Sequence, residues 1–144
     1  MNSATFSTDL LSLDDTRRLA RQLLAKAPTG SLIILTGPLG VGKTTLTQQL
    51  AAALNSVVQV TSPSYTLIHE YPTPAGLLIH MDAYRLPSAE TLLTFGLDDY
   101  LDRARLVVVE WGEALLPHYP KAIRVVLSFA AGGRRAEVRI PEAG

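Results

Sequence analysis

A glycine-rich segment between an apolar run and a helical pattern constrains this sequence more than any other feature. Residues Gly37 to Thr44 read Gly-Pro-Leu-Gly-Val-Gly-Lys-Thr and satisfy the pattern G-x-x-x-x-G-K-[ST] of a phosphate-binding loop. The preceding run, Ser31–Thr36, is rich in β-formers and predicts a strand buried on both faces. The segment Thr44–Leu54 predicts the helix that follows. Together they indicate a strand, a phosphate-binding loop (P-loop) and a helix of an α/β fold.

The residue types in this loop suit the binding of phosphate. Glycines let the backbone curl so that successive N–H groups point at phosphate oxygens, and the helix adds its free N–H groups and positive dipole end. Lys43 would bridge the β- and γ-phosphates, and the hydroxyl of Thr44 would bind Mg²⁺. The predicted nucleotide-binding residues are Gly37, Leu39, Gly40, Val41, Gly42, Lys43, Thr44 and Thr45.

Two carboxylates compete to be the second residue that holds the metal. Glu110 ends the apolar run Leu106–Val109, and Asp82 ends the run Leu77–Met81. Because ligands of open α/β sheets gather at the C-terminal ends of the strands, we expect both acids at one crevice. Glu110 follows the more apolar strand, so we assign Glu110 to Mg²⁺ and Asp82 to catalysis.

The remaining segments predict one mixed sheet with flanking helices. Ser12, with Asp15 three residues later, is a capping-box signature at the start of a helix over Ser12–Ala27. Further elements are expected as a strand at Val57–Val60, a hairpin of Thr66–Tyr71 and Leu77–Met81, helices at Ser88–Phe95 and Leu97–Leu101, and a hairpin of Ile123–Phe129 and Ala136–Ile140. The predicted fold is α/β, a P-loop NTPase-like mixed β-sheet flanked by helices with a C-terminal β-hairpin, in one domain over residues 1–144.

Composition excludes several classes of protein. Of the 144 residues, 47% are hydrophobic and 18% charged, which supplies a core and argues against disorder. The absence of cysteine excludes disulfide scaffolds, thiolate metal sites and cysteine catalysis. Basic and acidic residues balance, so nothing in the net charge favours coating nucleic acid or an anionic membrane. Met1–Leu13 lacks the basic start of a signal peptide, and no apolar run approaches the roughly 20 residues that span a bilayer, so we expect a cytoplasmic protein without a membrane partner.

The expected nucleotide is ATP. Guanine-specific enzymes read their base with Asn-Lys-x-Asp, and neither Asn2 nor Asn55 is followed by lysine. A small-molecule kinase stays open as an alternative, because such enzymes close a lid whose arginines contact the phosphates. Arg134 and Arg135, beside the turn at Gly132–Gly133, are the nearest counterpart here. A binding module that senses ATP without turning it over is a third hypothesis.

Four ordered motifs resemble the TsaE family, the small ATPase of bacterial threonylcarbamoyladenosine tRNA modification. These motifs are Gly37–Thr45, Thr61–Leu67, His80–Leu86 and Val109–Trp111. The resemblance extends from the first helix to the final hairpin. Pro38 and Val41 replace the Asp and Ala of the usual family loop, where the backbone does the binding, and Ser64 replaces a threonine and keeps a hydroxyl.

The resemblance implies a role for each matched residue. Thr44 and Glu110 would bind Mg²⁺, and Asp82 would be needed for ATP hydrolysis. Thr61–Tyr65 would act as a nucleotide-sensing switch, and Arg134 would lie near the nucleotide. The resemblance also implies the TsaD–TsaB pair as partner. Because the formal net charge is zero, we expect the partners to hold the tRNA, which this chain would contact only indirectly. Because no residue is an obvious arginine finger, we expect hydrolysis to be slow without that partner.

Other polar and aromatic residues receive structural interpretations. Trp111, the only tryptophan, is expected either to pack on the switch or to hold a plain core or edge position. Tyr84 and Arg85 could face a partner, but a local structural ion pair is the favoured interpretation. His69, His80 and His118 show no metal-ligand spacing, and all three are interpreted as structural or surface residues.

Overall fold

Seven strands form one mixed sheet in the computed structural model, which describes residues 4–38, 40–56, 68–84, 86, 88, 90–94 and 96–141. The strands are β1 (Ala4–Leu10), β2 (Ser31–Thr36), β3 (Ile68–Thr73), β4 (Gly76–Asp82), β5 (Ala104–Glu110), β6 (Ile123–Ala130) and β7 (Gly133–Ile140). Their order across the sheet is β1-β7-β6-β2-β5-β4-β3. The central strands β6, β2, β5 and β4 run parallel, whereas β1, β7 and β3 pair antiparallel with their neighbours. This arrangement confirms the predicted fold class.

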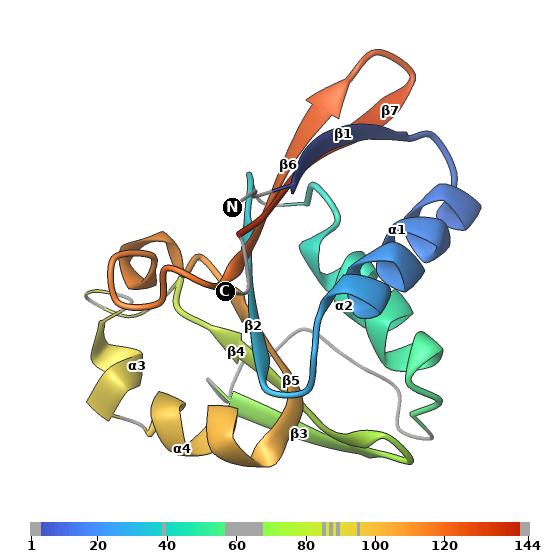
Figure 1. The fold of residues 1–144 in the computed structure, drawn as a ribbon. Helices are drawn as coiled ribbons and strands as arrows, with labels where there is room; N and C mark the ends of the chain where they lie inside the picture. Colours follow the sequence, from blue (N-terminus) through green and yellow to red (C-terminus); the bar gives the residue numbers. More distant parts are fainter. Residues whose placement is uncertain are drawn as a thin grey trace.

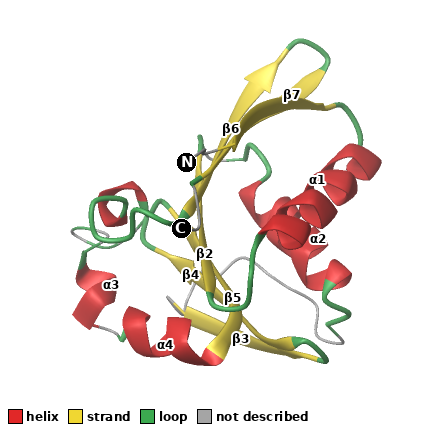
Figure 2. Ribbon diagram, viewed as in Figure 1, coloured by secondary structure: helices red, strands yellow, loops and turns green. Residues whose placement is uncertain are grey.

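Helices cover both faces of the sheet (Figures 1 and 2). One face is covered by α1 (Leu13–Lys26) and α2 (Lys43–Ala53), and the other by α3 (Thr91–Thr94) and α4 (Leu97–Arg103). A turn of 3₁₀ helix, Glu113–Leu115, follows β5. None of the helices in the described residues is both long and apolar enough to cross a membrane.

The two central strands explain why the sequence reads as continuous apolar runs. On β2, Ile33 and Leu35 belong to the core under α1 and α2, whereas Leu32 and Ile34 belong to the core on the other face. Strand β5 divides its side chains between the same two cores, so both strands are buried on both faces. The predicted strands at these two positions are confirmed.

Helix α1 begins and ends as the sequence predicts. Its N-cap is Ser12, whose Oγ accepts a hydrogen bond from the backbone N–H of Asp15 at 3.4 Å. The carboxylate of Asp15 in turn accepts from the backbone N–H of Leu11 at 2.9 Å, one residue before the N-cap that a capping box would use. The two predicted hairpins are also confirmed, as β3–β4 and β6–β7, although Thr66 and Leu67 of the first predicted strand lie outside the described residues.

Two parts of the prediction differ from the structure. No strand is predicted before Ser12, yet β1 pairs with β7 along its whole length and closes that edge of the sheet. The helix predicted over Ser88–Phe95 is too long, because α3 comprises only Thr91–Thr94. Glu90 instead accepts a hydrogen bond from His118 at 2.9 Å, and the backbone ahead of α3 forms an i, i+3 bond from Thr91 to Ser88. The predicted strand Val57–Val60 lies outside the described residues.

Packing of α2 against the sheet sets the position of the loop that precedes it. Leu46, in the first turn of α2, is fully buried in the core with Leu35 and Val108. This contact fixes the helix over the carboxyl ends of the central strands.

We expect Leu46→Ala to lower the free energy of unfolding by about 2–5 kcal/mol, because the leucine carbons beyond Cβ are removed from the core and leave a cavity. Urea denaturation measures this. The matched control is Leu13→Ala, since Leu13 is 51% exposed, and it should change the same quantity by less than about 0.5 kcal/mol. Equal losses in the two variants would contradict the assigned packing of α2.

Candidate active site

The loop between β2 and α2, residues 37–42, contains glycines with positive φ. Gly42 is the N-cap of α2 with φ 113°, and Gly37 follows β2 with φ 143°. A Cβ on Gly37 would collide with the backbone carbonyl of Leu127 on the adjacent strand β6. Glycine is therefore required here both by backbone conformation and by space. Leu39, one of the predicted binding residues, lies outside the described residues.

The side chain of Lys43 is folded back over this loop. Its ammonium donates to the carbonyl of Gly37 at 2.6 Å and to that of Pro38 at 3.1 Å. The same ammonium lies 4.3 Å from the ring centroid of Trp111. Lys43 is almost fully buried, and this burial lowers its pKa, against the opposing effect of the Glu110 and Asp82 carboxylates. The cation is thus held by neutral groups on one side of a pocket that carries anionic groups on the other.

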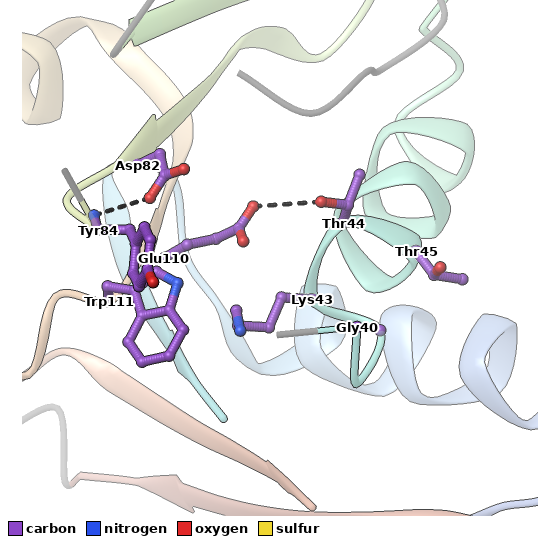
Figure 3. Close-up of a pocket in the computed structure, with 9 residues that line it drawn as sticks. Gly40, Lys43, Thr44, Thr45, Asp82, Tyr84, Glu110 and Trp111 are labelled. Carbon is purple, nitrogen blue, oxygen red and sulfur yellow. Dashed lines mark hydrogen bonds between the residues drawn. The ribbon is translucent and has the colours of Figure 1, made fainter. Parts of the chain in front are cut away.

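Glu110 reaches across this pocket from the end of β5 (Figure 3). Its Oε2 lies 3.5 Å from the hydroxyl of Thr44, in the first turn of α2. The same oxygen lies 2.6 Å from Nε2 of His80, a fully buried residue of β4. A hydroxyl and a carboxylate are the hard oxygen ligands that Mg²⁺ takes together with phosphates and water. The residues present therefore fit the predicted metal site.

Asp82 lies beside Glu110 at the same edge of the sheet. The two residues are register partners in the parallel pair β4–β5, so their side chains share one face. Oδ1 of Asp82 accepts a hydrogen bond from the backbone N–H of Tyr84 at 2.8 Å (Figure 3). This bond holds the turn after β4 and leaves the second carboxylate oxygen available to the pocket.

Trp111 and Tyr84 form an aromatic wall on the far side of the pocket from α2. Their rings are tilted by 46° with centroids 5.0 Å apart (Figure 3). Trp111 has φ 62°, the left-handed conformation that bulky residues rarely adopt. Its backbone N–H continues the sheet by donating to Leu35 at 3.1 Å. The tryptophan thus contacts Lys43 and Tyr84; the predicted switch, Thr61–Tyr65, lies outside the described residues.

These side chains enclose one pocket of about 260 Å³. It is lined by Gly40, Gly42, Lys43, Thr44, Thr45, Asp82, Tyr84, Glu110 and Trp111. Most of the predicted site residues therefore meet here, although the acids lie far along the chain from the loop. Gly37 contributes the carbonyl that holds Lys43, and the side chain of Val41 is buried in the core.

A second groove, of about 390 Å³, continues from this pocket on the other side of the loop. It shares Gly40, Gly42 and Thr45 with the first pocket and extends to the start of α1 and the β6–β7 hairpin. Arg134 of that hairpin lies over Gly42 and donates to the carbonyl of Gly40 at 3.3 Å. Arg135 instead bonds to Asp9 at 3.1 Å, on β1. Only the first of the two arginines named as lid candidates contacts the loop in the described residues.

Comparison with known proteins gives the family. A family model described as "Threonylcarbamoyl adenosine biosynthesis protein TsaE" matches residues 10–136. The chain belongs to the TsaE family. A Nostoc sp. protein named tRNA threonylcarbamoyladenosine biosynthesis protein TsaE is 39% identical over 115 residues, covering 76% of this chain and 70% of that protein. The Bacillus subtilis protein of the same name is 32% identical over 131 residues, covering 91% and 82%.

A solved structure supports the same grouping. The crystal structure of Bacillus subtilis YdiB superimposes with a TM-score of 0.71 and 28% sequence identity, covering 96% of this chain and 86% of that one. The resemblance to the TsaE family drawn from the four sequence motifs is confirmed. The roles that the resemblance implies for individual residues stay predictions.

The contact between His80 and Glu110 is the feature that sequence reasoning missed. His80 is fully buried, and its hydrogen-bond partner is the residue predicted to bind the metal. The available signal was its position two residues before Asp82 in a strand, which places both side chains on one face.

The requirement for glycine at position 37 is testable with a matched pair. We expect Gly37→Ala to lower the free energy of unfolding by about 3 kcal/mol or more, because backbone strain adds to overpacking. Gly40→Ala should cost only about 1–2 kcal/mol, since Gly40 has φ 78° but nothing lies within 4 Å of an added Cβ. Thermal denaturation of both variants measures the difference. A larger loss at Gly40 would contradict this geometry of the loop.

Proposed function

We propose that this chain is a Mg²⁺-dependent ATPase that supports threonylcarbamoylation of the adenosine next to the anticodon in tRNA, acting with the TsaB–TsaD pair. The observation that carries the proposal is the meeting of Lys43, Thr44, Glu110 and Asp82 around one pocket. The biosynthetic process comes from the names of the family and of the similar proteins. The ATP and Mg²⁺ assignments come from the loop and its facing carboxylates.

The phosphates of ATP would occupy the pocket beside the glycine-rich loop. Lys43 would exchange the carbonyls of Gly37 and Pro38 for phosphate oxygens, with the helix N-terminus of α2 directed at the same anion. The adjoining groove, which Arg134 borders, would take the ribose and base. Bound Mg²⁺ would supply positive charge to the phosphates, and Thr44 and Glu110 would hold it.

Hydrolysis would require a water in line with the γ-phosphorus. Asp82 lies in the same pocket and has one carboxylate oxygen free of the Tyr84 bond. That oxygen would accept a hydrogen bond from the attacking water and orient it. The water oxygen would form a bond to the γ-phosphorus as the bond from that phosphorus to the bridging oxygen breaks. The bridging oxygen and its electron pair would leave with ADP, and the proton lost by the water would be shared between the inorganic phosphate product and solvent.

The deciding experiment measures where the γ-phosphate goes. The purified chain is incubated with Mg²⁺ and labelled ATP, alone, with TsaB and TsaD plus tRNA, and with a panel of metabolites. Release of inorganic phosphate that TsaB and TsaD increase supports the proposal. Label transferred to a metabolite without any protein partner would instead favour the kinase alternative, and binding without turnover in every mixture would favour a nucleotide-sensing module.

We expect Lys43→Ala to weaken ATP binding by about 10- to 100-fold, because hydrogen bonds to a charged group are lost. Isothermal titration calorimetry measures the affinity. The matched control is Lys121→Ala, an exposed lysine outside the pocket, which should leave the affinity unchanged. Unaltered ATP binding by a folded Lys43 variant would remove the loop from the nucleotide site.

We expect Asp82→Asn to slow partner-stimulated hydrolysis by about 10²- to 10⁴-fold while ATP affinity stays within about twofold. Asparagine keeps an oxygen that can accept from the Tyr84 N–H, so the turn after β4 is preserved while the charge is lost. Asp82→Ala removes both the charge and the oxygen that accepts from Tyr84. The further loss of thermal stability in the alanine variant therefore measures how much that hydrogen bond stabilises the turn. If the asparagine variant hydrolyses ATP at the native rate, Asp82 has no catalytic role.

A further inference from the structure

His80 is a buried imidazole to which the proposed hydrolysis assigns no role. It is 0% exposed and pairs with Val108 in the parallel register of β4 and β5, so Glu110 is its diagonal neighbour on the same face. The side chains around it on this face include Leu78 and Val108, both fully buried and apolar. Burying a polar ring in such a place is costly unless the ring makes a specific hydrogen bond.

The partner of the ring is the carboxylate of Glu110, which is 6% exposed. The 2.6 Å separation of Nε2 and Oε2 is that of a short, charge-assisted hydrogen bond. Nδ1 is buried and has no hydrogen-bond partner among the described residues. The hydrogen-bond network therefore assigns Nε2 as the ring nitrogen that donates to Glu110, because a proton on Nδ1 would be buried without an acceptor.

We propose that His80 is a positioning residue that holds the carboxylate of Glu110 beside Thr44, ready for the cation that accompanies ATP. This inference rests on the proposed function. The bond from His80 restricts the rotation of the Glu110 carboxylate about its side-chain bonds. Both contacts of the carboxylate involve Oε2, so Oε1 is the oxygen that faces away from them. Such supporting contacts typically contribute a 10- to 100-fold factor in metal affinity.

Two substitutions at His80 separate positioning from packing. His80→Gln places an amide N–H at about the distance of Nε2 along the side chain and can still donate to Glu110. His80→Leu fills the space with an apolar side chain and donates nothing. The matched control is His118→Leu, which removes another imidazole–carboxylate contact, that of His118 with Glu90, from a surface outside the pocket.

The measurement is the affinity for the non-hydrolysable analogue AMPPNP, by calorimetry, with Mg²⁺ and with EDTA. The Mg²⁺-dependent gain is the ratio of the AMPPNP affinity with Mg²⁺ to that with EDTA. We expect His80→Leu to reduce this gain by about 10- to 100-fold and to leave the affinity in EDTA within about twofold of the native value. His80→Gln should recover most of the gain, and His118→Leu should behave as the native chain. In a Glu110→Gln background, His80→Leu should cost nothing further, because its effect acts through that carboxylate.

A second readout needs no nucleotide. Nitrogen NMR of the free protein should show His80 protonated at Nε2 and unprotonated at Nδ1, with the Nε2 signal displaced in Glu110→Gln. Any of three results would overturn the proposal. The first is a folded His80→Leu variant whose AMPPNP affinity rises with Mg²⁺ as much as that of the native chain, and the second is an equal loss of affinity with Mg²⁺ and with EDTA. The third is an effect of His80→Leu that is as large in the Glu110→Gln background as in the native chain. If Mg²⁺ does not raise the AMPPNP affinity of the native chain, the proposed function is wrong. The inference about His80 is then also wrong, whatever the NMR result.

Discussion

Parallel pairing of β2, β5 and β4 is the constraint on which the candidate site depends. The register sets Leu35 opposite Glu110 and Glu110 opposite Asp82, so three strands end at one level. Backbone hydrogen bonds continue the pairing one residue past Asp82 and Glu110. The N–H of Ala83 donates to the carbonyl of Glu110 at 2.9 Å, and the N–H of Trp111 donates to the carbonyl of Leu35 at 3.1 Å. Because carboxyl ends of parallel strands share an edge, residues far apart in sequence converge on the loop after β2.

This register is not specified by hydrophobicity alone. Strand β5 is apolar on both faces, so a shift by one residue would exchange one set of buried valines and leucines for another. The same shift would move Glu110 to the face covered by α3 and α4, away from Thr44 and His80. The polar contacts at the strand end therefore add specificity that the apolar core cannot supply.

The electrostatics of the edge agree with a site for a polyanion and a cation together. Lys43 is buried against carbonyls and an indole ring, and its pKa is lowered by that burial despite the nearby carboxylates. Removing an ammonium from water is costly when its contacts are neutral, and a phosphate would provide the missing opposite charge. Glu110 and Asp82, on the other side, would repel that phosphate unless a cation lay between them. These charges support the proposed binding of ATP together with Mg²⁺ rather than of ATP alone.

Sequence reasoning identified the parts of the fold that local patterns determine. The loop, its strand and helix, the two hairpins and the strand-end acids all follow from short runs of residues. Strand β1 was missed because its edge pairing is with β7, at the opposite end of the chain. The helix predicted over Ser88–Phe95 was too long, and the contact of Glu90 with His118, 28 residues away in the chain, is one that no local pattern contains. Leu39 and the predicted switch, outside the described residues, stay predictions.

The spacing of His80 and Asp82 shows how one strand can serve two different needs. Side chains on a strand alternate between faces, so a separation of two places both residues on the side of α2. Met81, between them, points into the opposite core. His80 lies two residues further from the strand end and is fully buried, so it contacts other side chains and not the pocket. Asp82, at the strand end, is half-buried and lines the pocket. Depth along the strand, rather than residue type alone, therefore separates the residue proposed to position Glu110 from the residue proposed to orient the attacking water.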